Sequence, residues 1–297
     1  MAFTLLDGGT GQTLHRRLGE PATPLWSAEA LKRRPDAVTT VHADFLRAGA
    51  EVITLASYTA TPLRLAEAGR EDEFDALQAA ALDAAQCARD EAAPHARIAG
   101  CLPPLHASYR PEDMPSEDEA AAEYARIVAA QERGVDLFLC ETLSTISGAA
   151  HATAAAKASG KPVWTALTVH ELNPGRLRGG EPLMEAASAA HENGADAVLI
   201  NCCRPEHVTE AVNALLAAGY ETGGYANGFT TALPLAQRGA TVDALERRAD
   251  LGPEAYAEIA LGWAEAGARI IGGCCEIEPA HIAEIARRRD ALVRLRA

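Results

Sequence analysis

Eight short runs of apolar, mostly β-branched residues recur along the chain, and alanine-rich segments with helical spacing separate them. Several runs are apolar without interruption, such as the Ala-Val-Leu-Ile stretch at 197–200. A continuous apolar run is typical of a strand that is buried on both faces, as in a parallel sheet covered by helices. The predicted strands cover residues 3–7, 51–57, 97–102, 136–142, 162–169, 197–203, 223–227 and 269–275.

The segments between these runs predict helices at 35–48, 71–92, 117–133, 146–159, 183–193, 205–218 and 253–266. A glycine stands between several of these helices and the next strand, and glycine is the favoured residue where a helix ends in the left-handed conformation. These glycines are Gly49, Gly134, Gly160, Gly194, Gly219 and Gly267. Eight strands that alternate with helices predict an α/β fold, either a (β/α)8 TIM barrel or a large doubly wound sheet. The even spacing favours the barrel, as one domain over residues 1–297.

The charge and the termini exclude several classes of protein. The formal net charge is −14, so the surface repels nucleic-acid phosphates and anionic lipids, and we expect neither nucleic acid nor membrane as a partner. The first residues lack the basic and apolar regions of a signal peptide, and no apolar stretch is long enough to span a bilayer. We therefore expect a cytoplasmic protein. No glycine-rich dinucleotide or ATP motif opens a helix.

The cysteines point to chemistry rather than to disulfides. Seven is an odd number, and two pairs are adjacent in sequence, Cys202-Cys203 and Cys274-Cys275. In a reducing compartment, clustered thiols of this kind indicate metal ligands or catalytic groups. The isolated cysteines are predicted to be small apolar core residues. They are Cys87, Cys101 and Cys140.

The polar residues of the chain gather where predicted strands end. In a barrel these ends and the loops after them form the active site. Two cysteine pairs at the ends of the sixth and eighth strands favour a zinc site with three thiolate ligands and one open position. Gly272 and Gly273 would leave room for a turn that aims both Cys274 and Cys275 at one metal ion. On an extended strand, Cys202 and Cys203 cannot both face that ion.

Asp7 and Glu141 end apolar strands and are predicted to enter the barrel mouth. A buried carboxylate needs a partner, so we expect these two to bind a cationic group such as an α-amino group; capping of the following segment is the alternative. Other residues at the strand ends are predicted to contribute to substrate binding. They are Gly8, Gly9, Ser57, Asn201 and Asn227.

At these residues the sequence resembles the homocysteine S-methyltransferase family. The resemblance covers nearly the whole chain and is most specific in the combination of Asn201-Cys202 with Gly272-Gly273-Cys274-Cys275. It also includes the Asp-Gly-Gly at 7–9, the Leu-Trp-Ser at 25–27, the segment 54–62, and the Gly-Glu-Pro-Leu at 180–183. The chain departs from the family pattern at Ala226, at Phe229 and in the loop 102–111.

The resemblance implies a (β/α)8 barrel whose zinc ion is held by Cys202, Cys274 and Cys275. It also implies that homocysteine binds through its sulfur, with Asp7 and Glu141 near its amino-acid end and Asn201 beside the metal. A zinc-bound thiol loses its proton and becomes the nucleophile. The reaction would then transfer a methyl group from a sulfonium or quaternary ammonium donor and give methionine. Candidate donors are S-methylmethionine, S-adenosylmethionine, dimethylsulfoniopropionate and betaine.

The few aromatic residues expected near the mouth could hold a methylated cation. They are Tyr58, Tyr109, Tyr225 and Phe229. Two other classes of function remain open: a zinc hydrolase with metal-bound water, and a non-enzymatic zinc- or thiol-binding barrel whose fourth ligand would be Cys203 or His207. A narrower alternative is the homocysteine-activating module of a corrinoid-dependent system, with the corrinoid on another chain. We expect a monomer or a simple homodimer.

Overall fold

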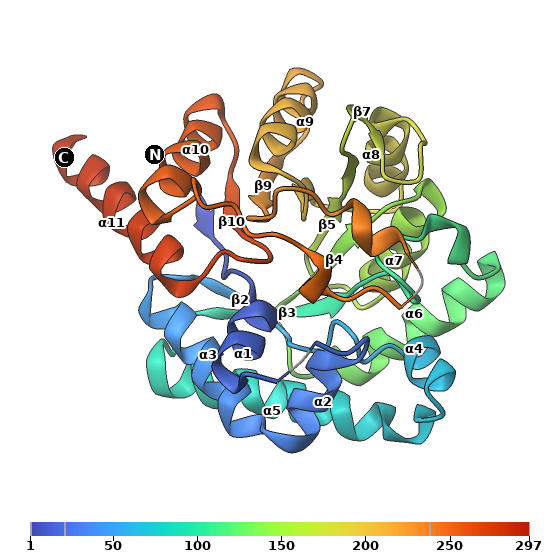
Figure 1. Ribbon diagram of the computed structural model, residues 1–297. Coiled ribbons are helices and arrows are strands. Elements are labelled where there is room, and N and C mark those ends of the chain that lie inside the picture. Colours follow the sequence, from blue (N-terminus) through green and yellow to red (C-terminus); the bar gives the residue numbers. More distant parts are fainter. Residues whose placement is uncertain (1, 21, 238, 297) are drawn as a thin grey trace.

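The computed structural model describes residues 2–20, 22–237 and 239–296, and it contains eight parallel strands with helices packed around them (Figure 1). Backbone hydrogen bonds from Glu51 to Leu5 and from Asp7 to Val52 join the first strand to the second and close the sheet. The predicted (β/α)8 barrel is therefore confirmed. The strands in spatial order are β1 (Thr4–Leu5), β10 (Ile270–Gly273), β9 (Thr222–Ala226), β8 (Ala197–Asn201), β5 (Val163–Leu167), β4 (Leu137–Leu143), β3 (Arg97–Leu102) and β2 (Val52–Thr54).

The predicted helices are found between these strands, with ends close to those expected. They are α3 (Pro35–Arg47), α5 (Phe74–Ala92), α6 (Glu117–Gln131), α7 (Ile146–Ala158), α8 (Leu183–Glu192), α9 (Pro205–Ala217) and α10 (Pro253–Ala266), and α11 (Pro279–Arg296) follows β10. Three helices were not predicted: α1 (Thr10–Leu18), α2 (Trp26–Arg33) and α4 (Pro62–Glu67). They lie in the long connections after β1 and β2, where short length or an internal glycine weakens the helical signal.

An antiparallel hairpin follows the fifth barrel strand along the chain. Its strands are β6 (Val169–His170) and β7 (Asn173–Leu177), and they lie outside the barrel sheet. A second long connection, residues 229–250 after β9, contains the short 3₁₀ turns η3 (Leu233–Ala236) and η4 (Val242–Ala244) and crosses the front of the barrel (orange in Figure 1).

Five of the six glycines predicted to end helices have the expected positive φ. Gly134 does not. A Cβ atom there would lie 2.6 Å from Cδ2 of Leu82 on α5, so this glycine allows two helices to approach closely.

Alternation along the strands decides which side chains enter the barrel. On β4, Leu137 and Leu139 belong to the apolar cluster inside the barrel, whereas Phe138 and Cys140 pack outward against the helices. Since side chains alternate along a strand, Glu141 follows the inward series and enters the mouth. On β9, Tyr225 points inward in the same way and Ala226 outward. The strands therefore deliver an acid and a phenol to one end of the barrel.

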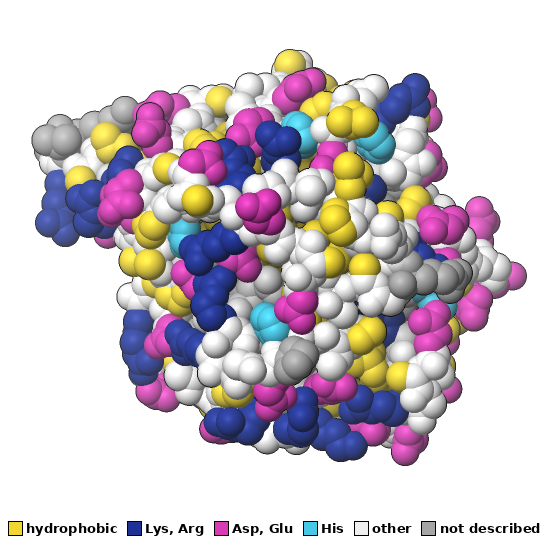
Figure 2. Space-filling view, in the orientation of Figure 1, with side chains coloured by type: hydrophobic (Ala, Val, Ile, Leu, Met, Phe, Trp, Pro, Cys, Tyr) yellow, Lys and Arg dark blue, Asp and Glu magenta, His cyan; other side chains and the backbone are white. Residues whose placement is uncertain are grey.

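Acidic and basic side chains are interspersed over the face shown in Figure 2. Among the described residues, no helix combines the length and the apolar character needed to cross a membrane.

Candidate functional site

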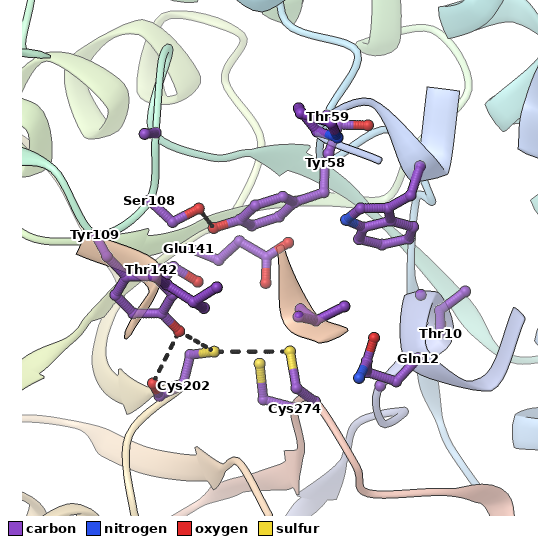
Figure 3. Close-up of a pocket in the computed structure, with 18 of the residues that line it drawn as sticks. Thr10, Gln12, Tyr58, Thr59, Ser108, Tyr109, Glu141, Thr142, Cys202 and Cys274 are labelled. Carbon is purple, nitrogen blue, oxygen red and sulfur yellow. Dashed lines mark hydrogen bonds between the residues drawn. The ribbon is translucent and has the colours of Figure 1, made fainter. Parts of the chain in front are cut away.

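The thiols of Cys202, Cys274 and Cys275 converge at the mouth of the barrel (Figure 3). Their three Sγ atoms all lie within 4.8 Å of one another, and those of Cys202 and Cys275 are 4.0 Å apart. Tetrahedral zinc with Zn–S bonds of about 2.3 Å would require sulfur atoms about 3.8 Å apart. A small contraction of the cluster would therefore suit a metal ion, and three soft thiolate donors suit zinc.

A tight turn after β10 brings the two adjacent cysteines to the same side. The amide of Ile277 donates to the carbonyl of Cys274 at 3.0 Å, which closes a turn over residues 274–277. Gly272 and Gly273 leave the predicted room, since a Cβ atom at Gly273 would lie 2.2 Å from Cγ2 of Ile277. The left-handed residue of this turn, however, is Glu276, with φ 67°.

Gly8 and Gly9 pack directly against the same turn. A Cβ atom at Gly8 would lie 2.2 Å from the carbonyl oxygen of Ile277, and one at Gly9 would lie 2.6 Å from that of Cys274. Both glycines also line the cavity above the cluster. Their lack of a side chain therefore lets the first strand's loop press against the cysteine-bearing turn.

The remaining cysteines lie outside the cluster. Cys203 is 1% exposed in the outer core, and burial raises the pKa of its thiol to about 12. Cys101 and Cys140 are buried, as predicted. The prediction for Cys87 is wrong, because this residue is exposed on α5. A cysteine is too small to reveal from spacing alone which face of an alanine-rich helix carries it.

Three non-glycine residues of the described chain have a positive φ, and all three flank the site. They are Thr142 at 60°, Cys202 at 50° and Glu276 at 67°. Such a conformation costs on the order of 1 kcal/mol or more per residue and persists only where surrounding contacts enforce it. At Thr142 the contacts come from Asn201, whose Oδ1 accepts from the Thr142 amide at 3.0 Å and whose Nδ2 donates to Thr142 Oγ1 at 2.9 Å.

A series of contacts between buried polar side chains connects Cys202 with the loops beside it. The hydroxyl of Tyr109 lies 3.0 Å from Cys202 Sγ, and the guanidinium of Arg178 lies 4.3 Å from the centre of the Tyr109 ring. Arg178 in turn pairs with Glu171 at 3.6 Å. Glu171 accepts hydrogen bonds from Thr231 Oγ1 and from the Ala232 amide, both at 2.6 Å. The hairpin and the 229–250 connection are thereby tied to one side of the cysteine cluster.

A cavity of about 570 Å³ opens above the three thiols. Small-molecule sites span roughly 300–1,000 Å³, so this volume suits small ligands. Asp7 and Glu141 line it beside the cluster, and Figure 3 shows the Glu141 carboxyl group between Tyr58 and the sulfur atoms.

Neither acid has an ion-pair partner within the described part of the chain. Oδ2 of Asp7 accepts from the Thr54 amide at 2.8 Å, and Oε1 of Glu141 accepts from Cys101 Sγ at 3.1 Å. Burial raises the pKa of Asp7 to about 8 and that of Glu141 to about 7. Two acids whose charged forms are disfavoured in this way would suit a cationic ligand, because its positive charge would stabilise the ionised carboxylates.

Three residues expected to bind substrate lie behind the cavity wall instead. Ser57 is 2% exposed, and its Oγ accepts from Gln131 Nε2 at 3.3 Å. Asn201 is fully buried and holds Thr142. Asn227 is 1% exposed, and its Oδ1 accepts from the Phe229 amide at 3.2 Å. Strand-end position brought these residues close to the site, but their side chains pair with the protein.

Aromatic side chains form much of the cavity wall. Tyr58, Tyr109 and Tyr225 line it, whereas Phe229 is not among the lining residues. Trp26 also lines it and was not predicted. A Cβ atom at Gly11 would lie 1.8 Å from the Trp26 ring, so this glycine makes the space that the indole fills. Arg64 was missed as well, because nothing in the sequence distinguishes an arginine on α4 from an ordinary surface residue.

Comparison with known proteins gives a consistent result. A family profile described as homocysteine S-methyltransferase matches residues 4–289. A homocysteine S-methyltransferase of Escherichia coli strain K12 is 32% identical, over 96% of this chain and 94% of its own length. A betaine–homocysteine S-methyltransferase 1 of Danio rerio is 30% identical, over 96% of this chain and 72% of its own.

A solved structure supports the same grouping. The homocysteine methyltransferase MmuM from Escherichia coli, in its metallated form, superimposes with a TM-score of 0.79 at 28% sequence identity. The match covers 97% of this chain and 96% of that one.

Proposed function

This chain belongs to the homocysteine S-methyltransferase family, and from that premise we propose that it transfers a methyl group from a sulfonium or quaternary ammonium donor to the sulfur of homocysteine. The products are methionine and the demethylated donor. We further propose Zn²⁺ as the metal, with Cys202, Cys274 and Cys275 as its protein ligands.

The observation that carries this proposal is the placement of three thiols and two unpaired carboxyl groups around one cavity. When bound to three thiolates, zinc would supply a Lewis-acidic position at which a fourth thiol loses its proton more readily. Within the described residues, no histidine joins the cluster, and neither does Cys203. This donor set favours the thiol chemistry over a hydrolase or a closed structural site.

The acids and the aromatic wall would orient the two substrates. Asp7 and Glu141 would bind the ammonium group of homocysteine, which fixes the acceptor at its amino end while its sulfur points at the cluster. Trp26, Tyr58 and Tyr109 would contact the methylated cation through their ring faces. In the reaction the acceptor sulfur forms a bond to the methyl carbon as the donor's bond to it breaks, and the bonding pair leaves with the donor as a neutral sulfide or amine.

A binding experiment tests the proposal directly. We expect about one zinc ion per chain and, by X-ray absorption, three sulfur ligands before substrate is added. Homocysteine should raise the sulfur count towards four and release a proton that calorimetry in different buffers can count, because the thiol binds as thiolate. Homoserine, which lacks sulfur, should do neither. Methionine formation from homocysteine with a panel of donors completes the test, and a constant sulfur count without product would contradict the proposal.

A second prediction concerns Tyr225, whose hydroxyl is buried and has no hydrogen-bond partner within the described residues. We propose that it donates to a polar group of the bound substrate. Tyr225→Phe should then lower kcat/KM roughly 3- to 20-fold while leaving the free energy of unfolding unchanged or raised, since a buried hydroxyl without a partner costs stability. Steady-state kinetics and urea denaturation measure the two effects.

Tyr256 supplies a matched control. Its hydroxyl donates to the Gly272 carbonyl at 2.6 Å and accepts from the Ala226 amide at 3.1 Å. Tyr256→Phe should therefore destabilise the protein by about 1–3 kcal/mol. If Tyr225→Phe behaves like this control, or leaves kcat/KM unchanged, its proposed role is wrong.

A further inference from the structure

Arg64 on α4 presents a positive charge to the cavity that holds the two unpaired acids. It is partly buried, and its guanidinium carbon lies 5.2 Å from the centre of the Tyr58 ring. Its Nη2 donates to the Pro104 carbonyl at 2.9 Å and to Ser108 Oγ at 3.4 Å, while its buried Nε has no partner within the described residues. Neutral groups therefore fix the position of this guanidinium without neutralising it.

No carboxylate of the described chain lies within ion-pair distance of Arg64. A second arginine on the same cavity behaves differently, since Arg110 pairs with Asp113 and, at 3.6 Å, with Glu112. A partly buried charge without a counter-ion is costly unless a ligand supplies one. Burial also lowers the pKa of Arg64, which an anionic ligand would reverse.

The position of Arg64 indicates which ligand it meets. Around Arg64 the cavity wall is formed by Glu67 of the same helix and by His106 and Ser108 of the loop that follows β3. The Glu67 side chain is 66% exposed, so this part of the wall is the outer one. The acceptor site, defined by Asp7, Glu141 and the cysteines, lies at the inner end. The face of Tyr58 lies next to Arg64, so a methylated cation on that wall would have the guanidinium within reach.

We propose that Arg64 binds the carboxylate of the methyl donor, so that this enzyme selects donors that carry both an onium centre and a carboxylate. The inference rests on the proposed methyl transfer and deepens it. The cavity is negative where the acceptor's ammonium group binds and positive where the donor's carboxylate binds. A guanidinium forms two parallel hydrogen bonds with a carboxylate, and its attachment to Ser108 and Pro104 holds it ready for that contact.

Equilibrium binding tests this assignment independently of turnover. Calorimetry would compare S-methylmethionine with its methyl ester, which keeps both cationic groups and lacks the carboxylate, on the zinc-loaded protein. We expect the ester to bind roughly 10- to 100-fold more weakly than the acid. Arg64→Gln should weaken binding of the acid by a similar factor and leave the ester unchanged. Arg64→Lys keeps the charge but loses the planar guanidinium, so its affinity for the acid should lie between those of the wild-type protein and Arg64→Gln.

Arg110→Gln is the control, because its charge is already paired, and it should change neither ligand's affinity. Equal affinity of the wild-type protein for acid and ester would overturn the proposal even if Arg64→Gln failed to fold. A loss of homocysteine affinity in Arg64→Gln with unchanged donor affinity would also overturn it. If the acid binds as predicted but no methionine forms with any donor, the proposed function fails and the carboxylate site stands.

Discussion

Replacing Cys274 with serine is expected to reduce the zinc content of the protein from about one ion per chain to near zero and methyl transfer at least ~1,000-fold. Zinc binding by protein ligands contributes about 10–16 kcal/mol, so the loss of one of the three protein ligands removes roughly 3–5 kcal/mol. Serine has nearly the same size, and its hydroxyl keeps its proton near neutral pH. Because Cys274 is only partly buried, the barrel should remain folded.

Elemental analysis, circular dichroism and methionine formation would be measured together on this variant. Cys203→Ala is the matched control, since Cys203 is adjacent to a proposed ligand yet packs in the outer core. It should cost about 1 kcal/mol of stability and keep both zinc and activity. Full zinc content in Cys274→Ser would refute the ligand assignment, and zinc loss in Cys203→Ala would show that the wrong member of the pair is assigned.

Replacing Asp7 with asparagine is expected to weaken homocysteine binding roughly 100-fold while making the free protein more stable. The loss of affinity follows because one of the two carboxylates facing the ammonium group is gone. Asparagine Oδ1 can still accept the hydrogen bond that Thr54 donates to Asp7 at 2.8 Å. The gain in stability follows because burial makes the folded protein keep a proton on Asp7 that the unfolded chain releases, and asparagine has no such proton.

The size of this gain in stability depends on pH. Burial raises the pKa of Asp7 from 3.8 to about 8, so between these values the folded protein keeps a proton that the unfolded chain has lost. The contribution of Asp7 to stability is therefore complete below about pH 4 and is lost as the pH rises to 8. Asp7→Asn removes this loss, and its advantage over the wild-type protein should grow from pH 5 to pH 8 in urea denaturation.

Glu141→Gln should likewise weaken homocysteine binding and stabilise the free protein. Its gain in stability should depend less on pH, because burial raises the pKa of Glu141 only to about 7. Glu67→Gln is the control, since Glu67 lines the same cavity but is 66% exposed. It should leave homocysteine affinity and stability unchanged. The cation-site interpretation would fail if Asp7→Asn bound homocysteine as tightly as the wild-type protein.

The order of strands and helices and the chemical type of the site could be predicted from the sequence. Continuous apolar runs mark strands that are buried on both faces, and glycines mark the ends of helices. Both signals can be read from residues that are neighbours along the chain. The bounds of β3 and α10 agree with the prediction residue by residue. The cysteine pairs stand at strand ends, and in a parallel barrel all such ends meet at one mouth, so their convergence followed from topology.

Tertiary structure alone decided which strand-end side chains face the cavity. The strands bend where they end, and there the alternation of side chains no longer applies, as the positive φ of Thr142 and Cys202 shows. Asn201 consequently holds Thr142 instead of lining the cavity. The ion pairs could not be predicted from the sequence either. Arg64 and Arg110 look alike in sequence and differ only in the carboxylates that the fold brings near them. Local patterns determine elements, whereas electrostatic partners depend on contacts between residues far apart in the chain.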